Sequence, residues 1–452
     1  MKDTTVISAA IDIGTTTVSA VVLDITNKRQ LESFNVPNDS TIVQNGSVHE
    51  QDPARILEIA SEIADRMLEK YPEISVLGFT GQMHGVLYVN SDGIAVSPLF
   101  TWQDGRGNLI SDTGRSYCED ITDLTGRAVS SGFGLVTHYC NIKKGMYTDP
   151  TLKICSIMDY LAMRFTGNSK PVVHPSVAAS FGLFDASECD FDRSAIAKLD
   201  INEDLLPEIA VNDMPIGSYR NVPVSTAIGD NQASVFGSVR DESNSVLVNY
   251  GTGSQMSIIT DKTDAKAPLE VRPYLFGKNL ICGCALCGGS AYAVIENFFR
   301  EYALSCGGED SSQYKVMDML AEKAYEEAKT PLTVSTVFKG TRQNPDERGG
   351  VYGISDANFT PDRLILGTIC GMVNELHGMY LEANEEKRVL VASGNAVQKG
   401  RVLRAVLCDK FATKPNLPLN KEEAATGAAM YASLCADLSL TLEEVKDCIE
   451  YA

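Results

Sequence analysis

The stretch Ile11-Asp-Ile-Gly-Thr-Thr-Thr17 decides the fold, because it returns in altered form as Val248-Asn-Tyr-Gly-Thr-Gly-Ser254. A short apolar run precedes and follows each copy: residues 7–13 and 18–25 for the first, 246–250 and 256–259 for the second. Strand, Gly-Thr turn and strand together are typical of a β-hairpin. One such hairpin at the head of each half of the chain predicts a duplicated fold.

The turns of these hairpins also indicate a ligand. Glycine lets backbone N–H groups approach closely, and threonine adds hydroxyl donors, so the turns suit phosphate oxygens. The first turn is not a P-loop, since that motif leads into a helix and carries a lysine. Two ordinary tight hairpins are the alternative for either copy alone. The recurrence, with Asp12 two residues before the first glycine, favours phosphate binding.

Composition excludes some classes of function. The 452 residues, with 44% apolar and 22% charged side chains, suit a globular protein of two domains. The net charge of −20 argues against a nucleic-acid surface, which needs a cationic footprint. ATP is not excluded, because backbone amides and a divalent metal can hold it locally. No apolar stretch approaches the roughly 20 residues that span a bilayer, so no membrane segment is expected.

The N-terminus and the cysteines predict a cytoplasmic location. Residues 1–5 lead directly into a strand without a signal peptide. The 12 scattered cysteines are then typical of reduced, buried thiols. Cys282, Cys284 and Cys287 form one close cluster, but a structural metal would need a fourth ligand. Alternation over residues 280–286 instead places Cys282 and Cys284 on one face of a strand.

Alternating β and α patterns predict α/β layers with a mostly parallel or mixed sheet. Apolar spacing, with Asp52 as N-cap and Pro53 in the first turn, predicts a helix over residues 54–71. Polar residues 241–244 mark a domain boundary, which gives domains over residues 1–242 and 243–452. Further strands are expected at 74–80, 222–228 and 388–392, and further helices at 159–165, 232–239, 290–304, 364–381 and 422–434.

Asp230 is the candidate general base. It lies where the strand over residues 222–228 gives way to the helix over 232–239. Ligands of open α/β sheets gather at such carboxyl ends of strands. The helix N-terminus stabilises the carboxylate as an anion, which can accept a proton. A plain helix cap is the alternative.

Two further loops carry polar side chains suited to a polar ligand. In Gly81-Gln-Met-His-Gly85, His84 is bracketed by glycines and can hydrogen-bond to a polar ligand, the alternative being a core histidine. Thr101-Trp-Gln-Asp-Gly-Arg106 contains the one tryptophan of the chain. Trp102, Asp104 and Arg106 alternate along this segment, so they can present an aromatic platform, an acceptor and a cation to a polyol. The alternative is a surface Asp–Arg pair beside a buried tryptophan.

A third loop, Ser393-Gly-Asn-Ala-Val-Gln-Lys-Gly400, follows a strand and opens a helix expected to run to about Phe411. Such a strand–Gly–helix turn can receive a nucleotide base and ribose, although many α/β turns have this pattern.

Together these segments resemble the FGGY carbohydrate kinases over residues 6–434. The resemblance implies an α/β fold of two actin-like, ribonuclease H-like domains (the actin/Hsp70/hexokinase ATPase fold) with a central interdomain cleft. It also implies that the first domain binds the sugar and the second binds ATP. The matching segments are Asp12–Thr16, Gly81–Gly85, Trp102–Arg106, Gly229–Gln232, Gly251–Ser254, Phe338–Pro345 and Ser393–Asn395.

The resemblance assigns roles to individual residues. Asp230 is implied as the catalytic base, and Asp12 is implied to orient Mg²⁺. The implied sugar contacts are Gln82, Met83, His84, Trp102, Asp104, Arg106 and Asn231. The implied ATP contacts are Gly14, Thr15, Thr16, Gly251, Thr252, Gly253, Gly394, Asn395 and Gln398.

Within the family, the sedoheptulokinase branch is the most similar. Residues 101–106, 272–274 and 285–289 resemble that branch, whereas Gln-Met-His-Gly is shared with xylulokinases. The implied reaction is phosphoryl transfer from MgATP to the terminal hydroxyl of a ketose, giving sedoheptulose 7-phosphate from sedoheptulose. Ser393-Gly-Asn395 departs from the common Gly-Gly-Gly pattern, which leaves the nucleotide preference open.

Other functions stay open at this point. A xylulokinase, or another family kinase acting on a pentulose or polyol, is the main alternative. A non-catalytic sugar or nucleotide sensor is disfavoured because Asp12 and Asp230 are both present, and a polymerising actin-like ATPase is disfavoured by the sugar-contact loops. The expected partners are a small-molecule ketose and MgATP, with no nucleic acid and no membrane. A homodimer is also considered, since related kinases are often dimers.

Overall fold

The computed structural model describes residues 5–210, 212–344, 346–436 and 438–452. Contacts within the chain define two compact units. Unit 1 comprises Met1–Arg240, Pro273–Gly277 and Asn420–Glu450, and unit 2 comprises Asp241–Arg272, Lys278–Leu419 and Tyr451–Ala452. The chain leaves unit 1 near the boundary expected at residue 242, and two later segments then group with unit 1 again. No helix in the described ranges is long and apolar enough to cross a membrane.

The sheet of unit 1 is built around the first hairpin. Its strand order is β14-β15-β6-β1-β2-β3, with β16 also paired to β6. β1 (Ile7–Ile13) runs antiparallel to β2 (Thr17–Asp24) and parallel to β6 (Ile74–Gly81). The remaining strands are β3 (Arg29–Pro37), β14 (Pro215–Tyr219), β15 (Val222–Ser225) and β16 (Ile228–Gly229).

The single strand expected over residues 222–228 is wrong, because the chain forms two short strands there. Val224 of β15 pairs with Leu77, whereas Ile228 of β16 pairs with Thr80. The register against β6 therefore shifts by one residue between the two pairs. One extra residue of this kind interrupts a ladder as a bulge does.

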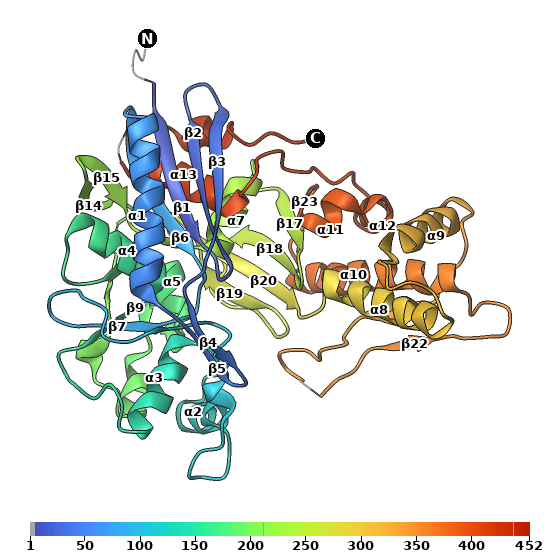
Figure 1. Ribbon diagram of the computed structural model, residues 1–452, viewed down its shortest axis with the longest axis horizontal. Helices are drawn as coiled ribbons and strands as arrows, with labels where there is room; N and C mark the ends of the chain where they lie inside the picture. Colours follow the sequence, from blue (N-terminus) through green and yellow to red (C-terminus); the bar gives the residue numbers. More distant parts are fainter. Residues whose placement is uncertain (1–4, 211, 345, 437) are drawn as a thin grey trace. The chain divides into compact units, whose positions relative to one another are not determined.

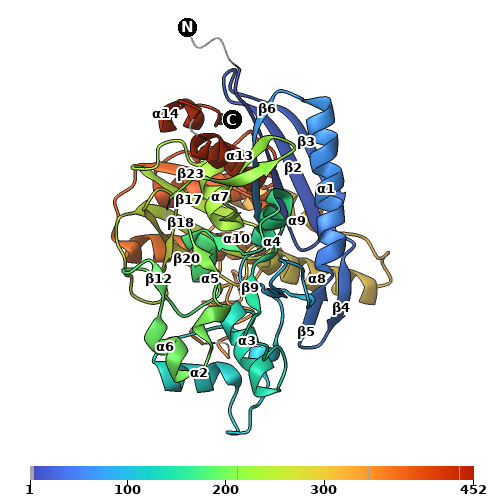
Figure 2. The same ribbon diagram turned by 90° about the vertical axis from the view of Figure 1, so that its left-hand side faces the viewer.

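Helices cover both faces of this sheet (Figures 1 and 2). α1 (Pro53–Lys70) packs on β1 and β2, and Asp52 caps it by accepting a hydrogen bond from the Ala54 amide, which confirms the predicted helix start. α4 (Ile157–Thr166) packs on the same side against β6. α7 (Asp230–Ser238) and α13 (Glu423–Cys435) cover the opposite face.

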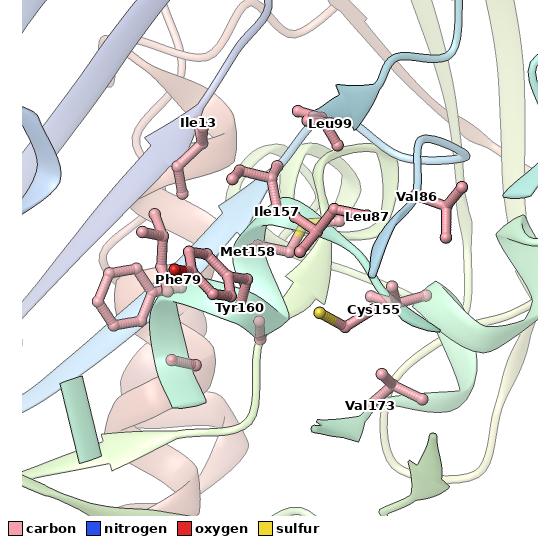
Figure 3. Close-up of a cluster of buried hydrophobic side chains, with 14 of the residues drawn as sticks. Ile13, Phe79, Val86, Leu87, Leu99, Cys155, Ile157, Met158, Tyr160 and Val173 are labelled. Carbon is pink, nitrogen blue, oxygen red and sulfur yellow. The ribbon is translucent and has the colours of Figure 1, made fainter. Parts of the chain in front are cut away.

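A continuous apolar core fills the side of the sheet beneath α1 and α4 (Figure 3). It joins strand residues of the sheet to residues of α4 and of the segments between them. Members drawn in Figure 3 include Ile13, Phe79, Val86, Leu87, Leu99, Cys155, Ile157, Met158, Tyr160 and Val173, which are at most 4% exposed.

The sheet of unit 2 repeats the pattern of unit 1, with strand order β19-β20-β18-β17-β23. β17 (Ser245–Tyr250) runs antiparallel to β18 (Ser254–Thr260) and parallel to β23 (Val389–Ser393), just as β1 does to β2 and β6. The predicted duplication is confirmed. The other elements are β19 (Glu270–Pro273), β20 (Asn279–Ala285), α8 (Gly289–Ser305), α9 (Tyr314–Glu326) and α10 (Pro361–Ala383).

The helix expected to continue to Phe411 is instead broken at Gly400. α11 spans Asn395–Lys399 and α12 spans Arg401–Phe411. Gly400 has an extended backbone, and the Arg404 guanidinium donates to the carbonyl oxygens of Val397 and Gln398. These bonds satisfy carbonyl groups that the end of a helix leaves without partners.

Smaller elements and the cysteines complete the description. All 12 cysteines are free thiols, and only Cys189 and Cys306 are exposed. The described residues contain no cluster of three or more His, Cys, Asp or Glu residues able to hold a metal.

Smaller elements surround the first sheet. They are β4 (Thr41–Asn45), β5 (Val48–Gln51), β7 (Leu87–Val89), β8 (Leu99–Phe100), β9 (Lys153–Cys155), α2 (Tyr117–Thr125), α3 (Gly134–Lys143) and α5 (Pro175–Ser180).

The small residues of α13 explain why this late segment belongs to unit 1. α13 packs against α7, and a Cβ at Gly427 would lie 1.8 Å from the carbonyl oxygen of Ala233. Only glycine permits this backbone approach, as predicted for an alanine-rich helix suited to close packing.

Gly427→Ala should therefore destabilise the protein, by about 1–3 kcal/mol as for other overpacked cores. Gly378→Ala in α10 is the matched control, because a Cβ there meets nothing within 4 Å. That control should be neutral or slightly stabilising, since alanine favours helix over glycine. Thermal unfolding by calorimetry measures both, and an unchanged midpoint for Gly427→Ala would contradict the packing described.

Candidate functional site

Three carboxylates from distant parts of unit 1 come together. Asp12 lies near the end of β1, Asp230 is the first residue of α7, and Glu422 directly precedes α13. Burial, followed by the negative charges of Asp230 and then Glu422, raises the pKa of Asp12 to about 8. Such a site favours a cation or a proton. Sequence analysis found Asp12 and Asp230 but missed Glu422, because only the return of the chain at residue 420 brings it here.

Asp230 is the first residue of α7, which begins two residues before the expected start at Gln232. Its Oδ1 accepts a hydrogen bond from the Asn231 amide at 2.7 Å. The preceding Gly229 pairs with Gly81 at the end of β6. A Cβ on Gly229 would lie 2.6 Å from the Met83 sulfur. The loop that carries Met83 and the strand that ends at Gly229, just before Asp230, therefore lie directly against each other.

A buried network also anchors the backbone that leads to Asp230. The Gly229 amide donates to Ser176 Oγ at 3.3 Å, and this hydroxyl lies 2.7 Å from His174 Nδ1. The Ser176 amide also donates to Nδ1, so the neutral ring carries its proton on Nε2, which lies 3.2 Å from Asp213. Tyr431 of α13 donates to the same carboxylate at 2.6 Å. Sequence analysis missed this network, since nothing marks its members as neighbours.

Thr15 joins the first turn to two other segments through a closed ring of hydrogen bonds. Its hydroxyl donates to Gln82 Oε1 at 3.2 Å, and Gln82 Nε2 donates to Gln51 Oε1 at 2.8 Å. Gln51 Nε2 returns to the carbonyl oxygen of Thr15 at 2.8 Å. Trp102 Nε1 then donates to the Thr15 hydroxyl at 3.0 Å. The turn, the Gln82 loop and the tryptophan thus form one connected unit.

His84 has a fixed orientation. Its backbone is left-handed, with φ of +71°, and its amide donates to Ser180 Oγ. Nδ1 lies 2.9 Å from the Ser180 carbonyl oxygen, which requires a proton on Nδ1, and the ring stacks on Phe133 at 4.7 Å. In the neutral ring Nε2 is then the acceptor. The prediction that His84 binds a ligand stays a prediction.

Asp104 and Arg106 form a buried ion pair, 1% and 8% exposed, with Nε and Oδ1 2.6 Å apart. Arg106 also donates to Asn141 at 2.6 Å and to Glu50 at 3.1 Å. Burial lowers the pKa of Arg106, but the hydrogen bonds and negative charges of Asp104 and Glu50 outweigh it, so the pKa is raised. Trp102, by contrast, is 48% exposed. The expected surface Asp–Arg pair beside a buried tryptophan is wrong, because the pair is buried and the tryptophan is half-exposed. The expected joint presentation of Trp102, Asp104 and Arg106 to a polyol is also wrong, because Asp104 and Arg106 turn inward.

Unit 2 contains a cavity of about 720 Å³ at the second turn. Gly251, Thr252 and Asn395 of the predicted nucleotide contacts line it, whereas Gly253, Gly394 and Gln398 are outside its lining. The amides of Gly289 and Ser290 at the start of α8 donate to carbonyl oxygens of the turn. Sequence analysis missed Tyr292, Tyr314, Asp318, Lys399 and Arg401, which complete the walls. Pro345 of the matching segment 338–345 lies outside the described residues.

Comparison with known proteins decides the family. The N-terminal domain of the FGGY family of carbohydrate kinases matches residues 7–237, about half of the chain. The chain belongs to the FGGY family of carbohydrate kinases. It is therefore a phosphotransferase of this family, and the predicted family and enzyme class are confirmed.

Individual relatives agree with this assignment. Mouse sedoheptulokinase is 26% identical over 443 residues, covering 88% of this chain and 91% of the relative. The crystal structure of xylulose kinase from Rhodospirillum rubrum superposes with a TM-score of 0.83 at 18% identity, covering 99% of this chain and 93% of that one. The crystal structure of Plasmodium falciparum glycerol kinase with ADP superposes with a TM-score of 0.80 at 20% identity, covering 98% of this chain and 92% of that one. These structures confirm the predicted actin-like ATPase fold of the FGGY kinase.

The Thr15 ring makes a direct prediction about the one tryptophan of this FGGY kinase. Thr15→Val keeps the side-chain shape but removes the hydroxyl that accepts the hydrogen bond from Trp102 Nε1. Because such a bond contributes about 1 kcal/mol, its loss should release the indole of Trp102. Quenching of Trp102 fluorescence by acrylamide should become more efficient. Thr16→Val, which alters the next, exposed position of the same turn, is the control. Equal quenching of both variants and the wild type would contradict the ring.

Proposed function

We propose that this FGGY kinase transfers the γ-phosphoryl group of ATP to the terminal hydroxyl of a ketose, with sedoheptulose as the acceptor. The sedoheptulokinase relative supports the choice of sugar. The observation that carries the reaction is the position of Asp230, which starts α7 close enough to Asp12 for their charges to interact. The carboxylate proposed as the base and the carboxylate proposed to bind the metal are thus neighbours beside the Gly14–Thr16 turn.

Asp230 acts as the general base. Its carboxylate accepts the proton of the sugar hydroxyl as the oxygen attacks the γ-phosphorus. Positioned proton transfer of this kind contributes about 10²–10⁴-fold. The rest of the acceleration comes from alignment and from neutralisation of charge on the phosphates. The network from Gly229 to His174 holds the backbone of the base in place.

Phosphate groups are held by backbone donors of the two Gly-Thr turns. The amides of Thr15 and Thr16 in unit 1, and of Gly251 and Thr252 in unit 2, are proposed as donors that need no positive side chain, which suits an acidic protein of net charge −20. The Gly14 amide already donates to the Thr17 carbonyl oxygen and shapes the turn. Asp12 fits Mg²⁺, because hard cations prefer carboxylate oxygens and water, and the neighbouring negative charges favour a cation. When bound, Mg²⁺ supplies neutralisation of the phosphate charge.

The sugar is held by residues around the base. Met83, His84, Trp102 and Asn231 are proposed as direct contacts, together with Gln82 through the Thr15 ring. Asp104 and Arg106 have their polar atoms bonded within the protein. We propose that this pair acts on the sugar through Glu50 rather than by direct contact.

Adenosine is proposed to occupy the cavity of unit 2. Tyr292 and Tyr314, which stack with ring centroids 5.9 Å apart, give it an aromatic wall suited to a base. Ser290 Oγ is buried in the lining and has no hydrogen-bond partner among the described residues. A buried hydroxyl without a partner at the start of α8 fits a polar ligand, since buried polar groups are normally paired.

The choice of sugar, the use of Mg²⁺, the homodimer and the cytoplasmic location stay predictions.

Asp230→Asn should abolish most of the transfer while leaving sugar binding intact, because the amide keeps the shape but cannot accept the proton. Turnover measured by ADP release should fall about 100- to 10,000-fold. Sedoheptulose binding, followed by Trp102 fluorescence, should stay within a few fold. Asp92→Asn, at an exposed loop of unit 1, controls for loss of charge. Near-normal turnover of Asp230→Asn would refute the assigned base.

Ala396→Leu should block nucleotide binding specifically. Ala396 lines the cavity opposite Gly289, and overpacking there costs about 1–3 kcal/mol, which corresponds to about 5- to 150-fold in affinity. ATP affinity measured by calorimetry should fall accordingly, with sedoheptulose binding unchanged. Ala265→Leu in an exposed loop of unit 2 is the control. Undiminished ATP affinity would remove adenosine from this cavity.

A further inference from the structure

One short helix connects the segment proposed to hold the sugar with the segment that carries the proposed base. α5 (Pro175–Ser180) has six residues and lies within unit 1. Ser176 and Ser180 are four residues apart, about one helical turn, so their side chains lie on the same face of the helix. Both are buried, with 1% and 3% exposed. The helix is therefore placed to fix two other segments at once.

Ser176 holds the backbone that leads to Asp230. Its hydroxyl donates to His174 Nδ1 at 2.7 Å and accepts a hydrogen bond from the Gly229 amide at 3.3 Å. His174 is itself held at Nε2, which lies 3.2 Å from Asp213. Because the Ser176 hydroxyl both donates and accepts within this network, its orientation is fixed.

Ser180 holds the loop that carries His84 in the same way, from the other end of α5. Its hydroxyl donates to the Val177 carbonyl oxygen at 2.7 Å and accepts a hydrogen bond from the His84 amide at 3.1 Å. The Ser180 carbonyl oxygen also accepts a hydrogen bond from His84 Nδ1 at 2.9 Å. The His84 ring thus presents Nε2, the acceptor of the neutral ring, in one fixed direction.

The bonds of α5 add to the connection that the sheet supplies. β16 pairs with β6 as far as Gly229 and Gly81, so this ladder includes neither Asp230 nor His84. The serines of α5 bind the Gly229 amide and His84 itself. A single connection would leave the two segments able to rotate relative to each other, whereas two connections fix their relative position.

The relative position of His84 and Asp230 decides which hydroxyl of a sugar reacts. A ketose carries several hydroxyls, and the one that meets Asp230 loses its proton and attacks the γ-phosphorus. His84 Nε2 is proposed to accept a hydrogen bond from another hydroxyl of the same molecule. The separation of the two acceptors therefore selects the reacting carbon. A misplacement of about 1 Å at a reacting centre can cost about 100-fold in rate.

We infer that α5 sets the position of the sugar relative to the base, with Ser176 and Ser180 as positioning residues. It thereby directs the phosphoryl group to one hydroxyl rather than to water. The inference rests on the proposed function and goes beyond it, because neither serine belongs to the segments assigned to the sugar or to the phosphates.

The test separates the two ends of α5 by steady-state kinetics with sedoheptulose and saturating MgATP. Ser176→Ala removes the acceptor of the Gly229 amide, so kcat should fall about 10-fold or more, while KM for the sugar changes less than about 3-fold. Ser180→Ala releases His84, so KM for the sugar should rise about 10-fold, as for the loss of a hydrogen bond. In both variants the ratio of inorganic phosphate to sugar phosphate should rise about 3-fold or more, because water then competes with a misplaced hydroxyl.

Neither KM nor this product ratio depends on the amount of folded enzyme, so a loss of stability alone leaves both unchanged. Ser225→Ala is the matched control, because Ser225 is also buried in unit 1 and its hydroxyl has no hydrogen-bond partner among the described residues. Its kinetic constants should equal those of the wild type. Ser176→Cys and Ser180→Cys keep a weak acceptor of similar size, so they should show the same two patterns at reduced strength, and they serve as the test should an alanine variant not fold.

Equal losses of kcat in both alanine variants, with KM and the product ratio unchanged, would overturn the inference, as would wild-type kinetics in both. A wild type that phosphorylates no ketose would instead reject the proposed function, so the two failures are distinguishable.

Discussion

The burial of a carboxylate beside two others is the constraint on which this site depends. Asp12, Asp230 and Glu422 arrive from the end of a strand, the start of a helix and the residue before another helix. Burial, followed by the negative charges of Asp230 and Glu422, raises the pKa of Asp12 to about 8. A folded protein keeps such an arrangement only where the surrounding framework fixes it, and functional sites are where it occurs. Here the framework is the ladder of β1, β6 and β16 together with α7 and α13.

The duplicated hairpins show how one framework serves two tasks. Asp12 in the first copy corresponds to Asn249 in the second, each two residues before the turn glycine. Asn249 donates to the hydroxyl of Ser393 at the end of the adjacent parallel strand, so the second turn carries no charge at that position. The backbone cradle is common to both units, while the carboxylate that suits a metal is present in only one.

Much of the fold could be predicted because its signals are local. The cap at Asp52, the Gly-Thr turns and the start of α7 each depend on a few consecutive residues. The bulge between β15 and β16 and the break at Gly400 were missed, since pairing with β6 and the Arg404 bonds decide them. Local pattern cannot report such long-range contacts.

The candidate site was predicted less completely, for the same physical reason. Alternation predicted that Trp102, Asp104 and Arg106 project together, but a short turn of 3-10 helix at Arg106 replaces the extended backbone that alternation requires. The ion pair then turns inward while the tryptophan stays at the surface. The position of Glu422 beside Asp12 depends on tertiary contacts across hundreds of residues.

The central claim, phosphoryl transfer to the terminal hydroxyl of a ketose, is tested most directly by identifying the product. Sedoheptulose and ATP with Mg²⁺ would be incubated with the purified chain and followed by ³¹P nuclear magnetic resonance. The account predicts ADP and one new phosphomonoester, whose phosphorus couples to the two protons of a terminal methylene group. ADP with inorganic phosphate alone, or an ester on an internal carbon, would contradict it.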